Sequence, residues 1–226
     1  DKAVNGRVYS SKKDNYLRAG DVRFIDLDGD KVLSEGSGTV SDPGDKRIIG
    51  NSLPRYSYTF RLGANWLGFD ISAFFQGVGK QDWYPTTYAY NFWGPYSFPS
   101  LSFIHKDFLK ECWSEENLGA YFPRQRGYAS YSGGALGVVN DRYLQDVSYL
   151  RLKNLTIGYT IPINKKILSS VRVYATGENL FYWSALKKHN KTVDPELTNT
   201  SSTYNAGSGV GYGYSRSFSV GIDVTF

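Results

Sequence analysis

Three aspartates at alternate positions form the clearest chemical motif of the sequence. Asp26, Asp28 and Asp30 are separated by single residues, and Gly29 lies inside the run. Carboxylates at positions one, three and five of a tight loop can converge on one hard cation such as Ca²⁺ or Mg²⁺. The sixth position is Lys31, where calcium loops of this kind have a glycine for the sharp turn. The motif therefore predicts either a calcium or magnesium site or a cation-free loop built on aspartate turns.

A cation in this loop would need a further carboxylate ligand. The twelfth position of the motif is Ser37, where an EF-hand loop has a bidentate carboxylate. Glu35 and Asp45 are acidic residues that could replace it. The predicted metal ligands are Asp26, Asp28 and Asp30, closed by Glu35 or Asp45.

A segment dense in aromatic residues extends from 79 to 99. Rings that carry a polar group stack well on sugar faces and also pack well against a protein partner. The segment could therefore contact a substrate, contact a partner protein, or form the interior of a folded loop. The candidate substrate or partner contacts are Trp83, Tyr84, Tyr88, Tyr90, Phe92, Trp93 and Tyr96.

Other chemistry finds little support in the residue types. Cys112 is the only cysteine, and His105 and His189 are isolated, so no zinc-ligand spacing occurs. Glu115 and Glu116 are adjacent and are poorly placed as a flanking catalytic pair. No serine or cysteine nucleophile lies in a recognisable hydrolase motif. We therefore predict no catalytic residues and no enzymatic activity.

Composition narrows the class of protein further. The chain has 226 residues, of which 16% are aromatic and none is methionine, so we expect a processed product or a piece of a longer protein. The net charge is +5, but the basic residues occur singly or in pairs. Nucleic-acid binding needs a clustered basic face, and no nucleic-acid partner is predicted. No run approaches the roughly 18 consecutive apolar residues of a membrane-spanning helix.

Apolar and polar residues alternate with a period of two in several segments. The alternation covers 56–66 and 69–75, which are separated by only two residues, and this spacing predicts a tight β-hairpin. It covers 154–161 and 171–176 and returns in 218–226. Strands of roughly ten residues are long for a globular protein and suit a tilted crossing of a bilayer.

Long and short connections alternate strictly between the predicted strands. Short turns on one side and long loops on the other are typical of outer-membrane barrels, whose short turns face the periplasm. A soluble β-sandwich, the alternative, has no reason to segregate loop lengths in this way. We therefore predict an all-β fold, a segment of a membrane-spanning antiparallel β-barrel. Its expected parts are an extracellular loop region (1–54), a hairpin (55–77), a long extracellular loop (78–147), a second hairpin (148–181), an extracellular loop (182–214) and a closing strand (215–226).

Both faces of the predicted strands fit a barrel wall. One face is apolar and has aromatic residues near its ends, as in the interfacial girdles of membrane barrels, while the other face carries small polar residues that suit a wet lumen. Because the smallest barrels have about eight strands, further strands are expected from elsewhere. The predicted girdle residues are Tyr56, Trp66, Phe69, Tyr159, Tyr182, Trp183 and Phe226.

Several colinear motifs carry a family resemblance between Gly20 and Phe226. The sequence resembles the C-terminal barrel region of SusC/RagA-type TonB-linked outer-membrane proteins. The matching motifs are Gly20–Asp30, Asp45–Pro54, Gly68–Gly79, Trp113–Asn117, Tyr121–Arg124, Ser148–Tyr159, Gly177–Phe181 and the closing strand that ends in Phe226.

The resemblance implies a transporter in the outer membrane of a Gram-negative bacterium. Such proteins are barrels of about 22 strands that hold an N-terminal plug, contact TonB and import oligosaccharides or peptides. A SusD-like surface lipoprotein usually caps the barrel. The implied partners are therefore this lipoprotein, the rest of the barrel and its plug, TonB, and outer-membrane lipid, and Phe226 would act in the assembly signal. A soluble β-sheet carbohydrate-binding module that uses the aromatic segment is the alternative.

Overall fold

The structure is a computed structural model, and it describes residues 18–100, 104, 106–130, 134–163, 168–190, 192–198, 209 and 211–226. The chain divides into two compact units. We call them the sheet unit (Asn51–Asp82, Asp146–Glu196 and Tyr212–Phe226) and the loop unit (Asp1–Gly50, Trp83–Gln145 and Leu197–Gly211).

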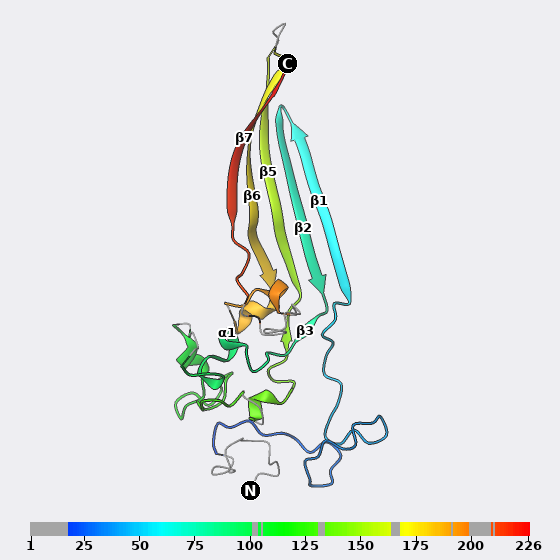
Figure 1. The fold of residues 1–226 in the computed structure, drawn as a ribbon, viewed down its shortest axis with the longest axis vertical. Helices are drawn as coiled ribbons and strands as arrows, with labels where there is room; N and C mark the ends of the chain where they lie inside the picture. Colours follow the sequence, from blue (N-terminus) through cyan, green and yellow to red (C-terminus); the bar gives the residue numbers. More distant parts are fainter. Residues whose placement is uncertain are drawn as a thin grey trace. The chain divides into compact units, whose positions relative to one another are not determined.

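The sheet unit is built on five long antiparallel strands. In spatial order they are β1 (Tyr56–Trp66), β2 (Phe69–Gly79), β5 (Tyr149–Pro162), β6 (Ser170–Ser184) and β7 (Ser217–Thr225). Figure 1 shows these strands side by side, and every neighbouring pair is antiparallel. This confirms the predicted all-β fold.

The remaining elements are short. Strands β3 (Asp82–Trp83) and β4 (Gln145–Asp146) form a two-stranded sheet. The helical segments are α1 (Tyr90–Trp93) and the 3₁₀ turns η1 (Gly94–Tyr96), η2 (Phe108–Glu111), η3 (Ala135–Gly137), η4 (Ala185–Lys188) and η5 (Pro195–Leu197). Among the residues that the structure describes, no helix is long and apolar enough to span a membrane.

The turn between β1 and β2 has the length that the sequence predicts. Leu67 and Gly68 both have positive φ, at 47° and 87°. Two consecutive residues with positive φ match the twist of paired strands and make a tight hairpin. The second predicted short turn, 162–169, lies partly outside the described residues, because 164–167 are not among them.

One face of the large sheet is apolar and exposed. The register places Phe60 opposite Phe75, with their rings stacked at 4.8 Å between centroids. The row continues to the last strand, where Phe218 is 77% exposed and Val220 85%. A soluble sandwich would bury such a face in its core, whereas the outer surface of a membrane barrel presents it to lipid.

An ionic ladder crosses the opposite, polar face. Arg172 on β6 donates to Asp70 on β2 at 2.7 and 2.9 Å, and to Asp223 on β7 at 3.1 Å. Strand β5 lies between β2 and β6, and its residue opposite Asp70 is Gly158, which has no side chain to obstruct the pair. A Cβ atom at Gly158 would lie 2.5 Å from Asp70 Oδ1 and 2.7 Å from Arg172 Nε.

The loop unit has an aromatic core. Trp93 packs edge-on against Phe92 and against Tyr143, and Phe122 lies stacked on Tyr96. All five rings are almost fully buried. Because aromatic side chains bury large apolar areas, this cluster supplies a core to a unit that has little regular secondary structure.

Replacing Gly158 with alanine should break the ionic ladder. Because the ladder is partly exposed, the loss is expected to be about 1 kcal/mol in the free energy of unfolding of the full-length protein in lipid vesicles. Gly63→Ala is the matched control, since its Cβ would lie at an ordinary 3.5 Å from the Ile71 carbonyl. Asp70→Asn combined with Gly158→Ala should cost no more than Gly158→Ala alone. If the loss of unfolding free energy in the double variant equalled the sum of the two single losses, it would contradict the ionic ladder.

Candidate functional site

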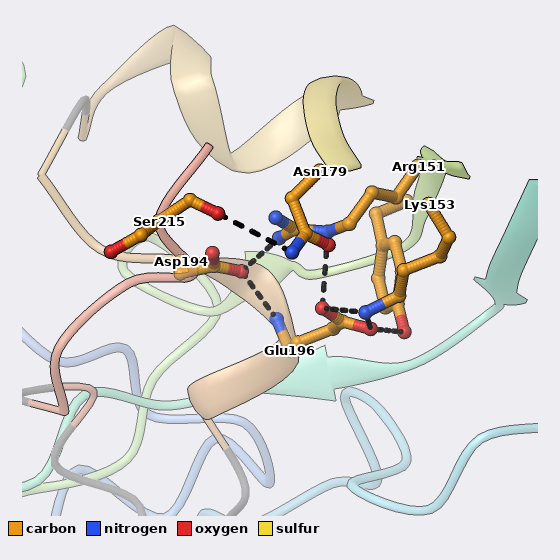
Figure 2. Close-up of polar contacts among 7 residues, drawn as sticks. Arg151, Lys153, Asn179, Asp194, Glu196 and Ser215 are labelled. Atoms are coloured by element: carbon orange, nitrogen blue, oxygen red, sulfur yellow. Dashed lines mark hydrogen bonds and ion pairs between the residues drawn. The ribbon is translucent and has the colours of Figure 1, made fainter. Parts of the chain in front are cut away.

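A buried cluster of four charged side chains is the most elaborate polar site of the sheet unit (Figure 2). Arg151 and Lys153 come from β5, and Asp194 and Glu196 come from the segment before η5 and from η5 itself. Arg151 forms an ion pair with Asp194, and its Nε lies 3.0 Å from Glu196 Oε2. Lys153 Nζ lies 2.8 Å from Glu196 Oε1. Two cations and two anions thus neutralise one another.

A β-bulge explains why two cations of β5 point into this cluster. Between the pairs Leu152↔Phe181 and Asn154↔Glu178, β5 has one additional residue and β6 has two. One additional residue reverses which face the following side chains occupy. Without it, Arg151 would share the apolar face with Leu155, and a charge would point toward lipid. The bulge therefore turns Arg151 to the polar face.

Aromatic rings and a hydroxyl complete the surroundings of the cluster. The guanidinium of Arg151 lies 4.6 Å from the ring centre of Tyr182 and 5.2 Å from that of Tyr214. The Tyr149 hydroxyl donates to Glu196 Oε1 at 2.9 Å. Cation–π contacts and charge-assisted hydrogen bonds offset the cost of taking the charges out of water.

The arrangement fastens the 192–197 segment to the sheet. Arg151 is 2% exposed in its side chain, and its partners Asp194 and Glu196 are 8% and 7% exposed. None of these groups is offered to solvent as a nucleophile or a general base, so the cluster is a structural clamp. Sequence reasoning assigned Arg151 no role, and its only signal is an arginine between two leucines in a strand.

The prediction that Tyr182 is a girdle residue is wrong. It lies opposite Arg151 in the register and stacks over its guanidinium, so it belongs to the polar face. Its neighbour Trp183 is 53% exposed and lies opposite Leu150. Successive residues of a strand point to opposite faces, which prevents Tyr182 and Trp183 from sharing a girdle.

The aspartate loop brings together only part of its predicted ligand set. Carboxylate oxygens of Asp26, Asp28 and Asp45 lie within 4.8 Å of one another. Asp30 instead accepts the amide of Val32 at 2.6 Å, and Glu35 pairs with Lys46 at 3.2 Å.

Backbone amides already hydrogen-bond to the converging carboxylates. Asp26 accepts from Gly29 at 2.6 Å and from Lys31 at 2.8 Å. Asp28 and Asp30 each accept the amide two residues further on, which are aspartate turns of the kind expected for the cation-free alternative. The amides of Leu27 and Ser34 bind Asp45 and lower its pKa.

The third of these carboxylates, Asp28, is affected by the negative charges around it. The amide of Asp30 donates to Asp28 and lowers its pKa, but desolvation and the negative charges of Asp30 and Asp45 outweigh this bond, and the net pKa is raised. Binding of Ca²⁺ or Mg²⁺ by the predicted ligands stays a prediction, and the structure brings Asp26, Asp28 and Asp45 of that set together. Calorimetric calcium titration of the full-length protein tests it: Asp45→Asn should abolish the binding heat, and an absence of heat in the unaltered protein would contradict it.

The aromatic candidates divide into buried and exposed rings. Trp83, Phe92, Trp93 and Tyr96 are at most 2% exposed, so they lie in the interior of the loop unit and offer no surface to a ligand. Tyr88 is 47% exposed. The structure thus favours packing for the four buried rings and leaves Tyr88 and the half-buried Tyr84 and Tyr90 as candidate contacts.

Buried tyrosine hydroxyls of this unit act as hydrogen-bond donors. Tyr96 donates to the Pro123 carbonyl at 2.6 Å, and Tyr84 donates to the Leu136 carbonyl at 2.8 Å. Burial raises the pKa of both hydroxyls, and it raises the pKa of Tyr143 to about 12. These groups therefore stay protonated at neutral pH and are not poised for proton transfer.

Comparisons with known proteins support the same class of protein. No family model matches the chain. It is 27% identical over 218 residues to TonB-dependent receptor P26 of Formosa agariphila, and 28% identical over 213 residues to TonB-dependent receptor P3 of the same organism. The alignments cover 92% and 90% of this chain but 20% and 19% of those proteins. The chain thus spans about one fifth of the length of the curated relatives it matches.

Solved structures agree in fold. The chain is similar to one in the structure of the RagAB peptide transporter, with a TM-score of 0.54 and 26% identity over 80% of this chain and 18% of that one. The open-open state of the RagAB peptide importer gives a TM-score of 0.51 at 22% identity, over 90% of this chain and 20% of that one.

The fold and the similar proteins together define the class of protein to which the chain belongs. The sheet, apolar on one face and ionic on the other, is a segment of a membrane-spanning antiparallel β-barrel. Within that class, the chain resembles a portion of the barrel of a SusC/RagA-type TonB-dependent transporter, as its motifs predict.

Removing Arg151 should loosen the clamp. Arg151→Ala leaves the buried Asp194 without its cationic partner and leaves Glu196 with Lys153 alone, and we expect a loss of about 3 to 5 kcal/mol in the free energy of unfolding. Hydrogen exchange of 192–197 in the full-length protein should accelerate. Lys153→Ala, which retains the Arg151 pairs, should have a smaller effect. If the amides of 192–197 exchange as slowly in both variants as in the unaltered protein, the cluster does not hold this segment in place.

Proposed function

We propose that the chain forms part of the barrel wall of a TonB-dependent importer in the outer membrane of a Gram-negative bacterium. The substrates are nutrient oligosaccharides or peptides, and passage through the lumen needs no covalent chemistry. The observation that carries this proposal is the two-faced sheet. Its exposed apolar face suits lipid, and its opposite face, with the Asp70–Arg172–Asp223 ladder, suits a wet lumen.

The proposed partners follow from this role. A SusD-like surface lipoprotein covers the barrel, a plug fills it, and TonB supplies the energy through a plug-side segment. Strand lengths support the membrane role: β5 and β6 have 14 and 15 residues, enough for a tilted crossing with some excess outside the bilayer. The loops 1–54, 78–147 and 182–214 lie on the extracellular side, the shorter turns face the periplasm, and Phe226 contributes to the assembly signal.

The exposed ring of Tyr88 is the proposed substrate or lipoprotein contact of the aromatic segment. It lies 6.0 Å from Phe98 with the two rings nearly parallel, at 18°. A stacked pair with an exposed member offers a flat apolar surface and a hydroxyl to a ligand. Tyr84 and Tyr90 remain secondary contacts in this proposal.

Fractionation and uptake test the proposed function. The full-length protein should sediment with the outer membrane. Deletion of its gene should abolish growth on the oligosaccharide or peptide that the protein imports. Tyr88→Ala should lower uptake or lipoprotein association at an unchanged protein level. Val40→Ala, which also alters an exposed loop residue, is the control and should change neither. If the full-length protein purified as a soluble monomer without detergent, a carbohydrate-binding module would be the better explanation.

A further inference from the structure

Two cations lie where the apolar face of the large sheet ends on the side of the long loops. Lys80 directly follows β2, and Arg216 directly precedes β7. Both residues are exposed, and within the described part of the chain neither side chain forms an ion pair. Position 216 alternates in step with Phe218 and Val220, and the chain enters β7 without a turn, so it belongs to their face. The apolar face is thus bordered by positive charge.

Lys80 is held over this face by its neighbours. Its ammonium lies 5.9 Å from the ring centre of Tyr56, the first residue of β1, which alternates in step with Phe60 on the apolar face. Lys80 has a φ of 53°, an uncommon value for a residue other than glycine, and its carbonyl accepts the amide of Arg55 at 3.3 Å. Such backbone conformations gather at functional positions.

The strands offer these cations no acidic partner on their own face. The acidic residues of the five long strands are Asp70, Glu178 and Asp223. Asp70 and Asp223 bind Arg172 on the polar face, and Glu178 accepts the hydroxyl of Ser217, which alternates in step with Asp223. The positive charge of the apolar face is therefore available to an anion from outside the strands.

The ends of the strands on this side form an oblique edge. Strand β6 continues to Ser184, but its partner β7 begins only at Ser217, which lies opposite Glu178. Strand β1 begins near the level at which β6 ends. Figure 1 shows β7 displaced along the strand direction relative to β1. Because strands tilt in a barrel wall, a membrane surface crosses their register obliquely, and Lys80 and Arg216 can share one depth.

Exposed aromatic rings mark the same oblique line. Tyr56 on β1 is 54% exposed, Trp183 near the end of β6 is 53% exposed, and Phe218 near the start of β7 is 77% exposed. Aromatic side chains of membrane proteins gather at the level of the lipid headgroups. A long basic side chain beside such a ring extends its charge to that level.

We propose that Lys80 and Arg216 bind the phosphate groups of a phosphorylated glycolipid in the outer leaflet of the membrane. The inference rests on the proposed function, which places the apolar face against lipid and the long loops outside the cell. The glycolipid presents acyl chains to the apolar face and phosphates to its border, and this matches both features of the surface. A free phosphate would use the cations alone. An ammonium binds phosphate as a point charge, and a guanidinium binds it through paired hydrogen bonds.

Binding of fluorescent bisphosphorylated lipid A to the full-length protein in detergent tests the proposal. One Lys or Arg near an anionic lipid surface contributes about fivefold in affinity. The double variant Lys80→Gln with Arg216→Gln should therefore weaken the apparent binding by about fivefold or more. Each single variant should have a smaller effect. Unchanged β-sheet circular dichroism of the variants controls for folding.

Arg61→Gln is the matched control variant. Arg61 is also an exposed cation, but alternation along β1 places it on the polar face, where its guanidinium lies 5.8 Å from the ring centre of Phe74. This variant should bind lipid A as the unaltered protein does. Lipid A without its phosphates should bind the unaltered protein and the double variant equally, and inorganic phosphate at the lipid concentration should displace no lipid.

Three results would overturn the proposal. The first is an unchanged affinity for lipid A in the double variant, including the case in which that variant instead loses association with the surface lipoprotein. The second is an equal affinity of the unaltered protein for lipid A with and without phosphates. The third is displacement of the lipid by inorganic phosphate. Failure of the proposed function is distinct, because it would appear in membrane fractionation and uptake whatever the affinity for one headgroup.

Discussion

Backbone hydrogen bonding in a lipid environment is the constraint on which the rest of the structure depends. A strand that crosses the hydrocarbon region must pair both of its edges, because an unpaired N–H or C=O group there costs several kcal/mol. Strands β2, β5 and β6 meet this condition within the sheet, whereas β1 and β7 are its outermost members. The unpaired edges of β1 and β7 would therefore need further strands in a membrane, and the relatives that the chain matches are about five times as long as this chain.

Side-chain placement follows from the same wall. Strict alternation puts one face toward lipid, so each charge must occupy the other face or be turned there. At the end of the sheet near the short turn, Gly158 leaves room for Arg172 to reach Asp70 across β5. At the other end, the bulge between Leu152 and Asn154 rotates Arg151 away from lipid and into the clamp. Gly158 and the additional residue of the β5 bulge thus both allow charged side chains to pair on the polar face, away from lipid.

Local patterns account for what the sequence predicts correctly. Period-two alternation and the two-residue turn at Leu67 and Gly68 depend on neighbours in the chain, and the five strands follow from them. The clamp depends on contacts between β5 and a segment more than forty residues later, together with a bulge that has no clear sequence signature. The same limit explains the aromatic segment, since tertiary packing determines which rings are buried. It also explains why Asp45, and neither Asp30 nor Glu35, joins Asp26 and Asp28.

Adjacent residues of β7 test the central claim most directly. Val220 lies on the apolar face and Ser219 on the polar face of a strand that crosses the membrane in this account. Single cysteines at these positions, introduced into full-length protein in which Cys112 is replaced, can carry a spin label in lipid vesicles. We predict that the label at 220 is relaxed by oxygen dissolved in lipid, and that the label at 219 is relaxed by a water-soluble nickel complex. Equal access of the nickel complex to both positions would contradict a membrane-spanning wall.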